Sequence, residues 1–223
     1  MLLAGSVNLG DLVDRLRRSR PVFHSEADLQ HAVAWVAHEM DPRLQVRLET
    51  HPEPHVRLDL LVTRADLGQS TAVELKYITA SWTGEVTGER FVLANHGAQD
   101  VRAYDVVKDL ERLERFVAKR PGSNGLVIVL CNDPSYWVPP RHARETNAKA
   151  FRLHDGNLIH GTLAWGPRTG AGTSKGRESA LTVAGRYTCA WTDFTTLAGR
   201  RGQFRLLAIP VPRSEPAPNV VSV

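Results

Sequence analysis

The chain has 223 residues, of which 42% are hydrophobic, 17 are glycines and 13 are prolines. These proportions are typical of globular proteins and exclude collagen-like, low-complexity and wholly disordered chains. The net charge of +4 hides an asymmetry, because residues 1–133 hold 16 basic and 19 acidic side chains whereas residues 134–223 hold 12 and 5.

Two helices are predicted at the start of the chain. Residues 9–20 carry apolar side chains at helical spacing, and Pro21 closes this run. Ser25 resembles the first residue of a capping box and opens a second helical pattern that reaches Met40. Trp35 counts among the apolar positions of this second helix.

Three strands should follow the helices. Apolar and polar residues alternate over 44–50, which is the period of a half-buried strand, and Pro52 with Pro54 is expected to end it. Residues 56–63 and 71–79 are rich in strand-forming side chains. The turn residues between them favour an antiparallel hairpin.

A loop, a helix and a buried strand complete the front half. Residues 80–96 are polar and contain glycine, so we expect a loop. Residues 97–120 follow a helical period and stop at Pro121, which predicts a long amphipathic helix. The continuous apolar run 126–130 predicts a strand buried on both faces. The predicted order is therefore α, β, β, β, α, β.

The back half shows strand patterns at 158–165, 180–191 and 203–211. Residues 166–177 are basic and rich in glycine without apolar anchors, which indicates a mobile hairpin tip. No helical pattern in the back half could cover a second core, so these strands should extend the first domain.

These patterns divide the chain into four parts. Residues 1–21 form a helical segment and residues 22–133 form the core. Residues 134–212 form a β-rich, basic extension packed on that core, and the proline-rich residues 213–223 form a disordered tail.

The two cysteines and the apolar runs indicate the cellular compartment of the protein. Cys131 and Cys189 lie far apart in apolar runs without metal-ligand spacing, which predicts neither a disulfide nor a zinc site. The first residues lack the pattern of a secretion signal, and no apolar run reaches the about 18 residues of a membrane helix. We therefore expect a cytoplasmic protein that has no membrane partner.

A charged pair interrupts the second strand of the predicted hairpin. Glu74 and Lys76 are two residues apart, so both side chains should project from one face of this strand. Val73, Leu75 and Tyr77 should project from the other face. On an exposed face such a pair would be an ion pair of little energetic value. The apolar runs imply a covered sheet instead, where an unneeded carboxylate is costly.

Asp59 interrupts the apolar run of the partner strand, and the hairpin should bring it close to Glu74. Neighbouring carboxylates repel each other unless a cation lies between them. A hard ion such as Mg²⁺ or Mn²⁺ is held by one or two carboxylates together with water and substrate phosphate. This pattern is typical of a site that cleaves phosphodiesters, in which Lys76 orients water or stabilises developing charge.

From residue 22 to residue 133 the chain resembles the PD-(D/E)XK nuclease superfamily, which has the restriction-endonuclease-like fold. That superfamily has a core in α-β-β-β-α-β order, an Asp on the second strand, an acid-x-Lys motif on the third and often an acid on the first helix. The matching residues are Asp59, Glu74 with Lys76, and Glu26. The implied fold class is α/β (α+β), with a mixed central sheet flanked by helices and a β-rich C-terminal extension.

The resemblance has two departures. Leu58 stands where a proline often precedes the Asp of the superfamily. Gln99 and Tyr104 are one residue out of step with the Q-x-x-x-Y pattern of the RecB-like branch, so we do not assign the chain to that branch.

The resemblance implies a metal-dependent hydrolase acting on nucleic acid. It gives Asp59, Glu74 and the carbonyl of Leu75 as ligands of Mg²⁺ or Mn²⁺. It gives Lys76 as catalytic base or stabiliser and Glu26 as an auxiliary catalytic acid. As an alternative, Glu26 is simply an acid that the dipole of its helix stabilises.

Residues for substrate binding come from the long helix and the basic back half. The helix offers Gln99, Asp105, Lys108 and Asp109, of which Gln99 and Lys108 are the candidates for substrate binding. The back half offers Arg141, Arg144 and Arg177 for phosphate contacts. The aromatic residues of the back half either stack on bases or belong to the core: Tyr136, Trp137, Trp165, Tyr187 and Trp191.

The leading hypothesis is a metal-dependent nuclease that acts on DNA rather than RNA, in bacterial restriction, repair or defence. The sequence leaves open a homodimer or a partner protein. A second hypothesis is a catalytically silent module of the same fold that binds nucleic acid or a partner. A third is an acid/base hydrolase that uses Glu74 and Asp59 on a sugar, against which Lys76 argues.

Overall fold

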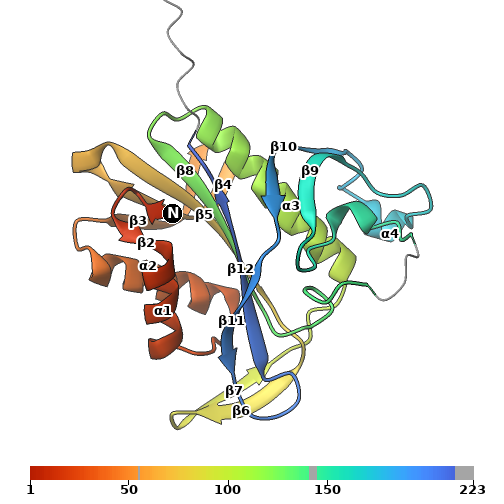
Figure 1. Ribbon diagram of the computed structural model, residues 1–223, viewed down its shortest axis with the longest axis horizontal. Coiled ribbons are helices and arrows are strands. Elements are labelled where there is room, and N and C mark those ends of the chain that lie inside the picture. The colour runs from red at the N-terminus through yellow and green to blue at the C-terminus, as the bar shows by residue number, and fades with distance from the viewer. Residues whose placement is uncertain (55, 141–144, 214–223) are drawn as a thin grey trace, which may run out of the picture.

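The computed structural model describes residues 1–54, 56–140 and 145–213 (Figure 1). The elements, in chain order, are β1 (Leu2–Leu3), β2 (Val7–Asn8), α1 (Leu9–Ser19), α2 (Glu26–Met40), β3 (Gln45–Glu53), β4 (Val56–Arg64), the short helix η1 (Ala65–Leu67), β5 (Gln69–Ile78), β6 (Trp82–Val86), β7 (Glu89–Leu93), α3 (Gln99–Ala118), β8 (Ser123–Cys131), η2 (Lys149–Phe151), β9 (Leu158–Leu163), α4 (Ala171–Ser174), β10 (Leu181–Thr188), β11 (Trp191–Thr196) and β12 (Gln203–Val211). The fold is mixed α/β with a mixed central sheet.

Six strands form the central sheet in the order β11-β12-β8-β5-β4-β3. Strands β5 and β8 run parallel, and each other neighbouring pair is antiparallel. All nine residues of β8 are buried, which confirms the prediction of a strand covered on both faces. The parallel pair therefore lies at the centre of the sheet.

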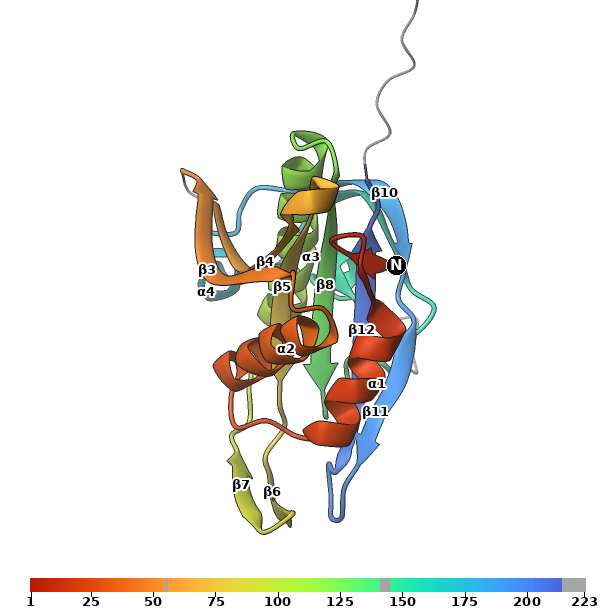
Figure 2. The ribbon, with the colours of Figure 1, turned by 90° about the vertical axis from the view of Figure 1, so that its left-hand side faces the viewer.

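Helices lie on both faces of the sheet (Figures 1 and 2), and each face carries a separate core. Helices α1 and α2 pack on one face, against a core that includes Leu75 and Tyr77. Helix α3 and the β9–β10 pair cover the other face, where Ile78 of β5 is buried. Alternate side chains of β5 thus serve different cores, as the sequence pattern predicts.

Helix α2 begins where the capping signal predicts. The Oγ atom of Ser25 accepts a hydrogen bond from the backbone N–H of Asp28 at 3.2 Å. The inclusion of Trp35 in the apolar face is wrong, because Trp35 is 68% exposed and its Nε1 donates to Glu39 at 2.7 Å. Hydrophobic type alone does not bury a side chain on the outer face of a helix.

Two predictions in the front half are wrong. Strand β3 runs through Pro52 instead of ending before it, because β3 is the edge of the sheet and an edge strand tolerates a proline. The predicted loop over 80–96 contains the β6–β7 hairpin, which projects beyond the end of the sheet (Figure 2). Its turn places Thr87 and Gly88 at positive φ, the backbone that a tight two-residue hairpin needs.

The back half adds two strands to the central sheet. Strand β12 pairs with β8, and β11 continues the sheet beyond it. The predicted strand 180–191 is divided, because β10 pairs with β9 whereas Trp191 starts β11 in the central sheet. The predicted hairpin tip 166–177 contains the one-turn helix α4. Residues 214–223 of the predicted tail lie outside the described residues.

The aromatic residues of the back half belong to the core on the α3 side. Tyr136, Trp137, Tyr187 and Trp191 are all buried there. Trp165 stacks on Tyr104 and packs against Phe151, with ring centroids 5.4 Å and 4.7 Å away. The four buried side chains are therefore core residues that cannot stack on a base, whereas Trp165 is partly exposed.

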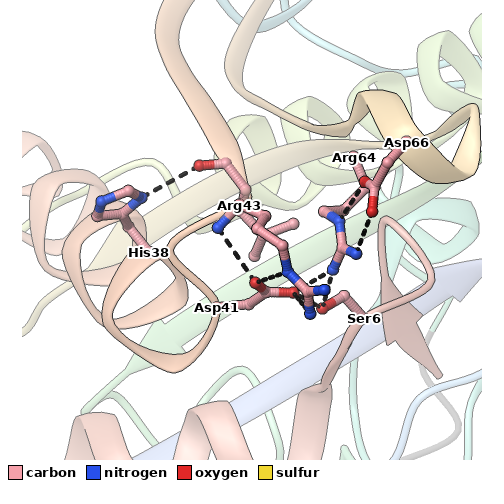
Figure 3. Close-up of polar contacts among 7 residues, drawn as sticks. Ser6, His38, Asp41, Arg43, Arg64 and Asp66 are labelled. Carbon is pink, nitrogen blue, oxygen red and sulfur yellow. Dashed lines mark hydrogen bonds and ion pairs between the residues drawn. The ribbon is translucent and has the colours of Figure 1, made fainter.

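A buried ionic cluster fastens the end of α2 to the end of β4 (Figure 3). The Arg64 guanidinium, 4% exposed, pairs with Asp41 after α2 and with Asp66 in η1 at 2.6 Å. Asp41 also receives hydrogen bonds from Ser6 and Arg43. The cluster joins the two elements that carry Glu26 and Asp59.

Both cysteines are free and buried. In the part of the chain that the structure describes, no helix combines the length and the apolar character that crossing a membrane requires.

Candidate active site

The strands β4 and β5 separate where the predicted site residues lie. Their pairing runs from Arg64 and Gln69 to Leu60 and Val73, and it stops there. Beyond this point β5 continues beside β8 alone. Backbone N–H groups on the freed edge of β5 need other partners.

Two carboxylates accept the hydrogen bonds of the backbone N–H groups on this freed edge of β5. The backbone N–H of Leu75 donates to Oδ2 of Asp59 at 2.7 Å, and the N–H of Tyr77 donates to Oε2 of Glu26 at 2.9 Å. Asp59 comes from β4, whereas Glu26 comes from the first turn of α2. The structure therefore brings both predicted acids to the edge of the strand that carries Glu74 and Lys76.

The side chains of Glu74 and Lys76 both reach α3 from the same face of β5. The Nζ atom of Lys76 lies 2.8 Å from Oδ2 of Asp109 and donates to the carbonyl of Leu75 at 3.3 Å. Nη2 of Arg112 lies 2.7 Å from Oε1 of Glu74 and 2.8 Å from Oδ1 of Asp109. The prediction that Glu74 and Lys76 share a face is confirmed.

Arg112 is the residue of this site that the sequence analysis missed. It stands three positions after Asp109 on α3, so both side chains lie on one side of the helix. Asp109, named as a polar residue able to reach the site, does reach it. The three-residue spacing of Asp109 and Arg112 is the sequence signal that predicts Arg112 beside Asp109 in the site.

The site holds more acids than bases. Four carboxylates (Glu26, Asp59, Glu74 and Asp109) share it with two cations (Lys76 and Arg112), so their formal charges sum to −2. The neighbouring Glu49–Arg57 ion pair is neutral as a unit and does not change this balance. A half-buried excess of negative charge is unfavourable without a further cation.

The pKa values of three of these carboxyl groups are raised. Burial raises the pKa of Asp59, and the charge of Asp109 raises it further, against the lowering effects of the Leu75 hydrogen bond and Lys76. Burial likewise raises the pKa of Glu26. The pKa of Glu74 rises most, because its side chain is only 1% exposed and Asp109 lies near it, and Arg112 only partly offsets these effects.

Lys76 is held in its charged form. Burial acts to lower the pKa of its ammonium group, but the charges of Asp109, Glu26 and Asp59 outweigh burial and raise this pKa above its ordinary value. At neutral pH Lys76 is therefore a donor of hydrogen bonds and not a proton acceptor.

The oxygen atoms of the site match the ligands that a hard divalent ion prefers. Carboxylates of Asp59 and Glu74, the Leu75 carbonyl and the unbalanced negative charge suit Mg²⁺ or Mn²⁺ in chemistry. Within the described ranges no three His, Cys, Asp or Glu side chains converge closely enough to hold an ion together. Arg112 engages the Glu74 carboxylate in this arrangement. The residues fit the ion chemically, with one ligand already engaged by an internal cation.

The predicted substrate-binding residues divide into three groups. Arg177 pairs with Asp105 at 3.6 Å, one helical turn before Asp109, and Lys108 is exposed on the same helix. Gln99 donates to the carbonyl of Ser135 at 2.6 Å, and it lies about 15 Å along α3 from Asp109. The structure does not bring Gln99 to the acids. The predicted residues Arg141 and Arg144 lie outside the described residues.

Two cavities lie away from these acids. One of about 800 Å³ lies beside the start of α3 and is lined by Gln99 and Asp133, among others. The other, of about 900 Å³, lies beside α2 and is lined by Trp35. Neither is lined by Asp59, Glu74 or Lys76. Asp59 and Lys76 are partly exposed, so the site reaches the surface of the molecule at these two residues, whereas Glu74 and Asp109 are buried beneath it.

Comparisons with known proteins add no relative. No family model matches the chain, and no curated protein or solved structure matches it.

Proposed function

We propose that this protein is a metal-dependent nuclease that hydrolyses phosphodiester bonds in nucleic acid, in DNA rather than RNA. The observation that carries the proposal is the separation of β4 from β5, which gathers four carboxylates around only two cations. An acid-x-Lys pair and a neighbouring Asp at such a junction suit phosphodiester cleavage with Mg²⁺ or Mn²⁺.

The proposal includes a restriction-endonuclease-like core over residues 22–133. Its support is the succession α2, β3, β4, β5, α3 and β8, into which the β6–β7 hairpin is inserted. The mixed sheet and the helices on both of its faces agree with such a core.

Each site residue has a role in this proposal. Asp59, Glu74 and the carbonyl of Leu75 would hold the divalent ion, which when bound supplies charge neutralisation at the scissile phosphate and a more acidic water. Lys76, kept protonated by its acidic neighbours, donates to a phosphate oxygen or orients the water.

Other residues position this group. Asp109 holds the ammonium of Lys76 at 2.8 Å. Glu26 fixes the edge of β5 through the N–H of Tyr77 and adds negative charge beside Lys76. Lys108 and Arg177 belong to the surface that contacts the phosphate chain, and Arg141 and Arg144, which lie outside the described residues, remain predicted phosphate contacts.

A second candidate is a module that binds nucleic acid or a partner protein without cleaving. The observation in its favour is that Arg112 and Lys76 already engage Glu74 and Asp109 in ion pairs. This candidate predicts salt-sensitive binding without turnover.

A cleavage assay separates the two candidates. Purified protein is incubated with linear duplex, nicked duplex, single-stranded DNA and RNA, in Mg²⁺, Mn²⁺ or chelator. The proposal expects cleavage that requires the metal and is lost in Asp59→Asn. The exposed acid Glu85 on the β6–β7 hairpin provides the matched control Glu85→Gln, which keeps activity. Binding without cleavage of any substrate in either metal supports the silent module, and cleavage that persists in Asp59→Asn refutes the proposal.

A further inference from the structure

Arg112 lies between two buried carboxylates of the site. One nitrogen, Nη2, is 2.7 Å from Oε1 of Glu74 and 2.8 Å from Oδ1 of Asp109, and Nε donates to Glu74 at 3.1 Å. The Glu74 side chain is 1% exposed and that of Asp109 is 7% exposed. A single cationic group therefore bridges oxygens from a strand and from a helix that are both removed from solvent.

The guanidinium occupies the place of a counter-ion. Two buried carboxylates that face each other repel unless one of them takes up a proton or a cation lies between them, and Arg112 supplies such a cation from α3. Its side chain is 23% exposed, so it reaches these acids from the surface. A divalent ion that takes Glu74 as a ligand must compete with Arg112 for the same carboxylate, and the two positive charges repel each other.

We propose that Arg112 is an internal counter-cation that pairs with Glu74 in the metal-free protein and releases the Glu74 carboxylate when a divalent ion binds. This inference rests on the proposed metal site. Arg112 keeps its second partner, Asp109, after it leaves Glu74. It is a positioning residue that lowers the affinity of the site for the ion, so its removal strengthens ion binding. A merely structural bridge has the opposite effect, because its loss loosens the ligands.

The test measures Mn²⁺ affinity by calorimetry and by the electron paramagnetic resonance signal of the free ion. Wild type is compared with Arg112→Met, which keeps a long side chain and removes the charge. The matched control is Arg115→Met, because Arg115 lies on the same helix, pairs with Glu111 and is 61% exposed. We expect Arg112→Met to bind Mn²⁺ about tenfold more tightly than wild type or more, and Arg115→Met to bind it as wild type does.

The outcomes separate this inference from the proposed function. If wild type binds Mn²⁺ and Arg112→Met binds it equally or more weakly, the role of Arg112 is wrong and the metal site stands. If neither protein binds Mn²⁺, both the metal site and the inference fail.

A second measurement tests the proposal on wild-type protein and so does not require Arg112→Met to fold. The side-chain Nε–H signal of Arg112 is followed by NMR in wild type and identified by its absence in Arg112→Lys. Addition of Mg²⁺ should shift this signal, because the hydrogen bond from Nε to Glu74 is broken. A signal that stays in place while Mg²⁺ binds overturns the proposal.

Discussion

Lys76 is charged because of its neighbours and in spite of its burial. Its ammonium lies 2.8 Å from Asp109 and 3.3 Å from the Leu75 carbonyl, and the charges of Glu26 and Asp59 raise its pKa further. A lysine in this state does not accept a proton from water at neutral pH. Of the two roles implied by the resemblance, base or stabiliser, these contacts favour the stabiliser.

The first prediction follows from that role. Lys76→Met should lower the cleavage rate about 10²- to 10³-fold, because it removes a preorganised charge from the transition state. Binding of Mn²⁺ should persist, since Lys76 provides no ligand. The measurement is single-turnover cleavage beside Mn²⁺ calorimetry, and Lys119→Met serves as control because Lys119 is 64% exposed and pairs with Glu53. A variant that keeps the full rate would contradict the role of Lys76.

Part of the site was visible in the sequence. Strand alternation placed Glu74 and Lys76 on one face, and the hairpin placed Asp59 on the neighbouring strand. The bond from Tyr77 to Glu26 and the bridge by Arg112 were not predictable in this way, because they depend on where β4 leaves β5 and on the path of α3. Periodicity describes one element at a time, whereas these contacts join elements that are distant in the sequence.

At the scale of elements, the separation of β4 and β5 requires that α2 be held in place. Glu26 at the start of α2 bonds to β5, and Asp41 after its end bonds to Arg64 at the end of β4. Hydrogen bonds from Arg43 and Ser6 hold the pKa of Asp41 well below its ordinary value of 3.8. A carboxyl group with a lowered pKa stabilises the fold above its unfolded pKa and loses that effect as pH falls through its folded value.

The second prediction is a pH dependence. Asp41→Asn should be less stable than wild type near pH 7, and the difference should shrink as the pH falls below about 4, since the unfolded wild-type chain then binds a proton at Asp41 that the folded protein does not bind. Urea unfolding followed by circular dichroism at several pH values measures it. A difference between the two proteins that is constant from about pH 7 to about pH 3 would show that the charge of Asp41 has no part in it.

Elements were predictable where the local signals were strong. The cap at Ser25 and the apolar run of β8 marked α2 and the central strand. The β6–β7 hairpin was not predictable from composition, because its segment is polar and contains glycine like a loop; its two-residue turn at Thr87 and Gly88 is the local signal for it. Strand β3 can include Pro52 because β3 is an edge strand. Its place at the edge is a property of the whole sheet, which a local sequence pattern does not predict.

At the scale of the whole molecule, the basic back half completes the sheet that carries the acids. Strand β12 pairs with β8 over seven residues, from Arg205 to Val211. Without it, β8 would expose a row of unpaired backbone groups and an apolar surface. This arrangement could not be read from local patterns, because it joins residues about 80 positions apart in the chain.

The third prediction concerns this dependence. A chain of residues 1–133, which ends at the boundary of the predicted core, should lack a cooperative unfolding transition, because β8 loses its β12 neighbour. Thermal unfolding and limited proteolysis measure this against the full chain. A truncated chain that unfolds cooperatively at the temperature of the full protein would contradict it.

The acidic front half and the basic back half of the sequence supply different charged residues to the neighbourhood of the site. The acidic front supplies Glu26, Asp59, Glu74 and Asp109, and the basic back brings Arg177 onto the helix that carries Asp109. The acids suit a divalent ion, and a basic surface suits the phosphate chain on which the ion would act.

The central claim is that Asp59 and Glu74 hold a divalent ion at the separation of β4 and β5. Its most direct test is a crystal of the full chain grown with Mn²⁺, with the ion located by its anomalous scattering. The account predicts an anomalous peak within about 2.0–2.6 Å of oxygens of both Asp59 and Glu74. A crystal at saturating Mn²⁺ that has no peak there, and in which Arg112 still bridges Glu74 and Asp109, would contradict it.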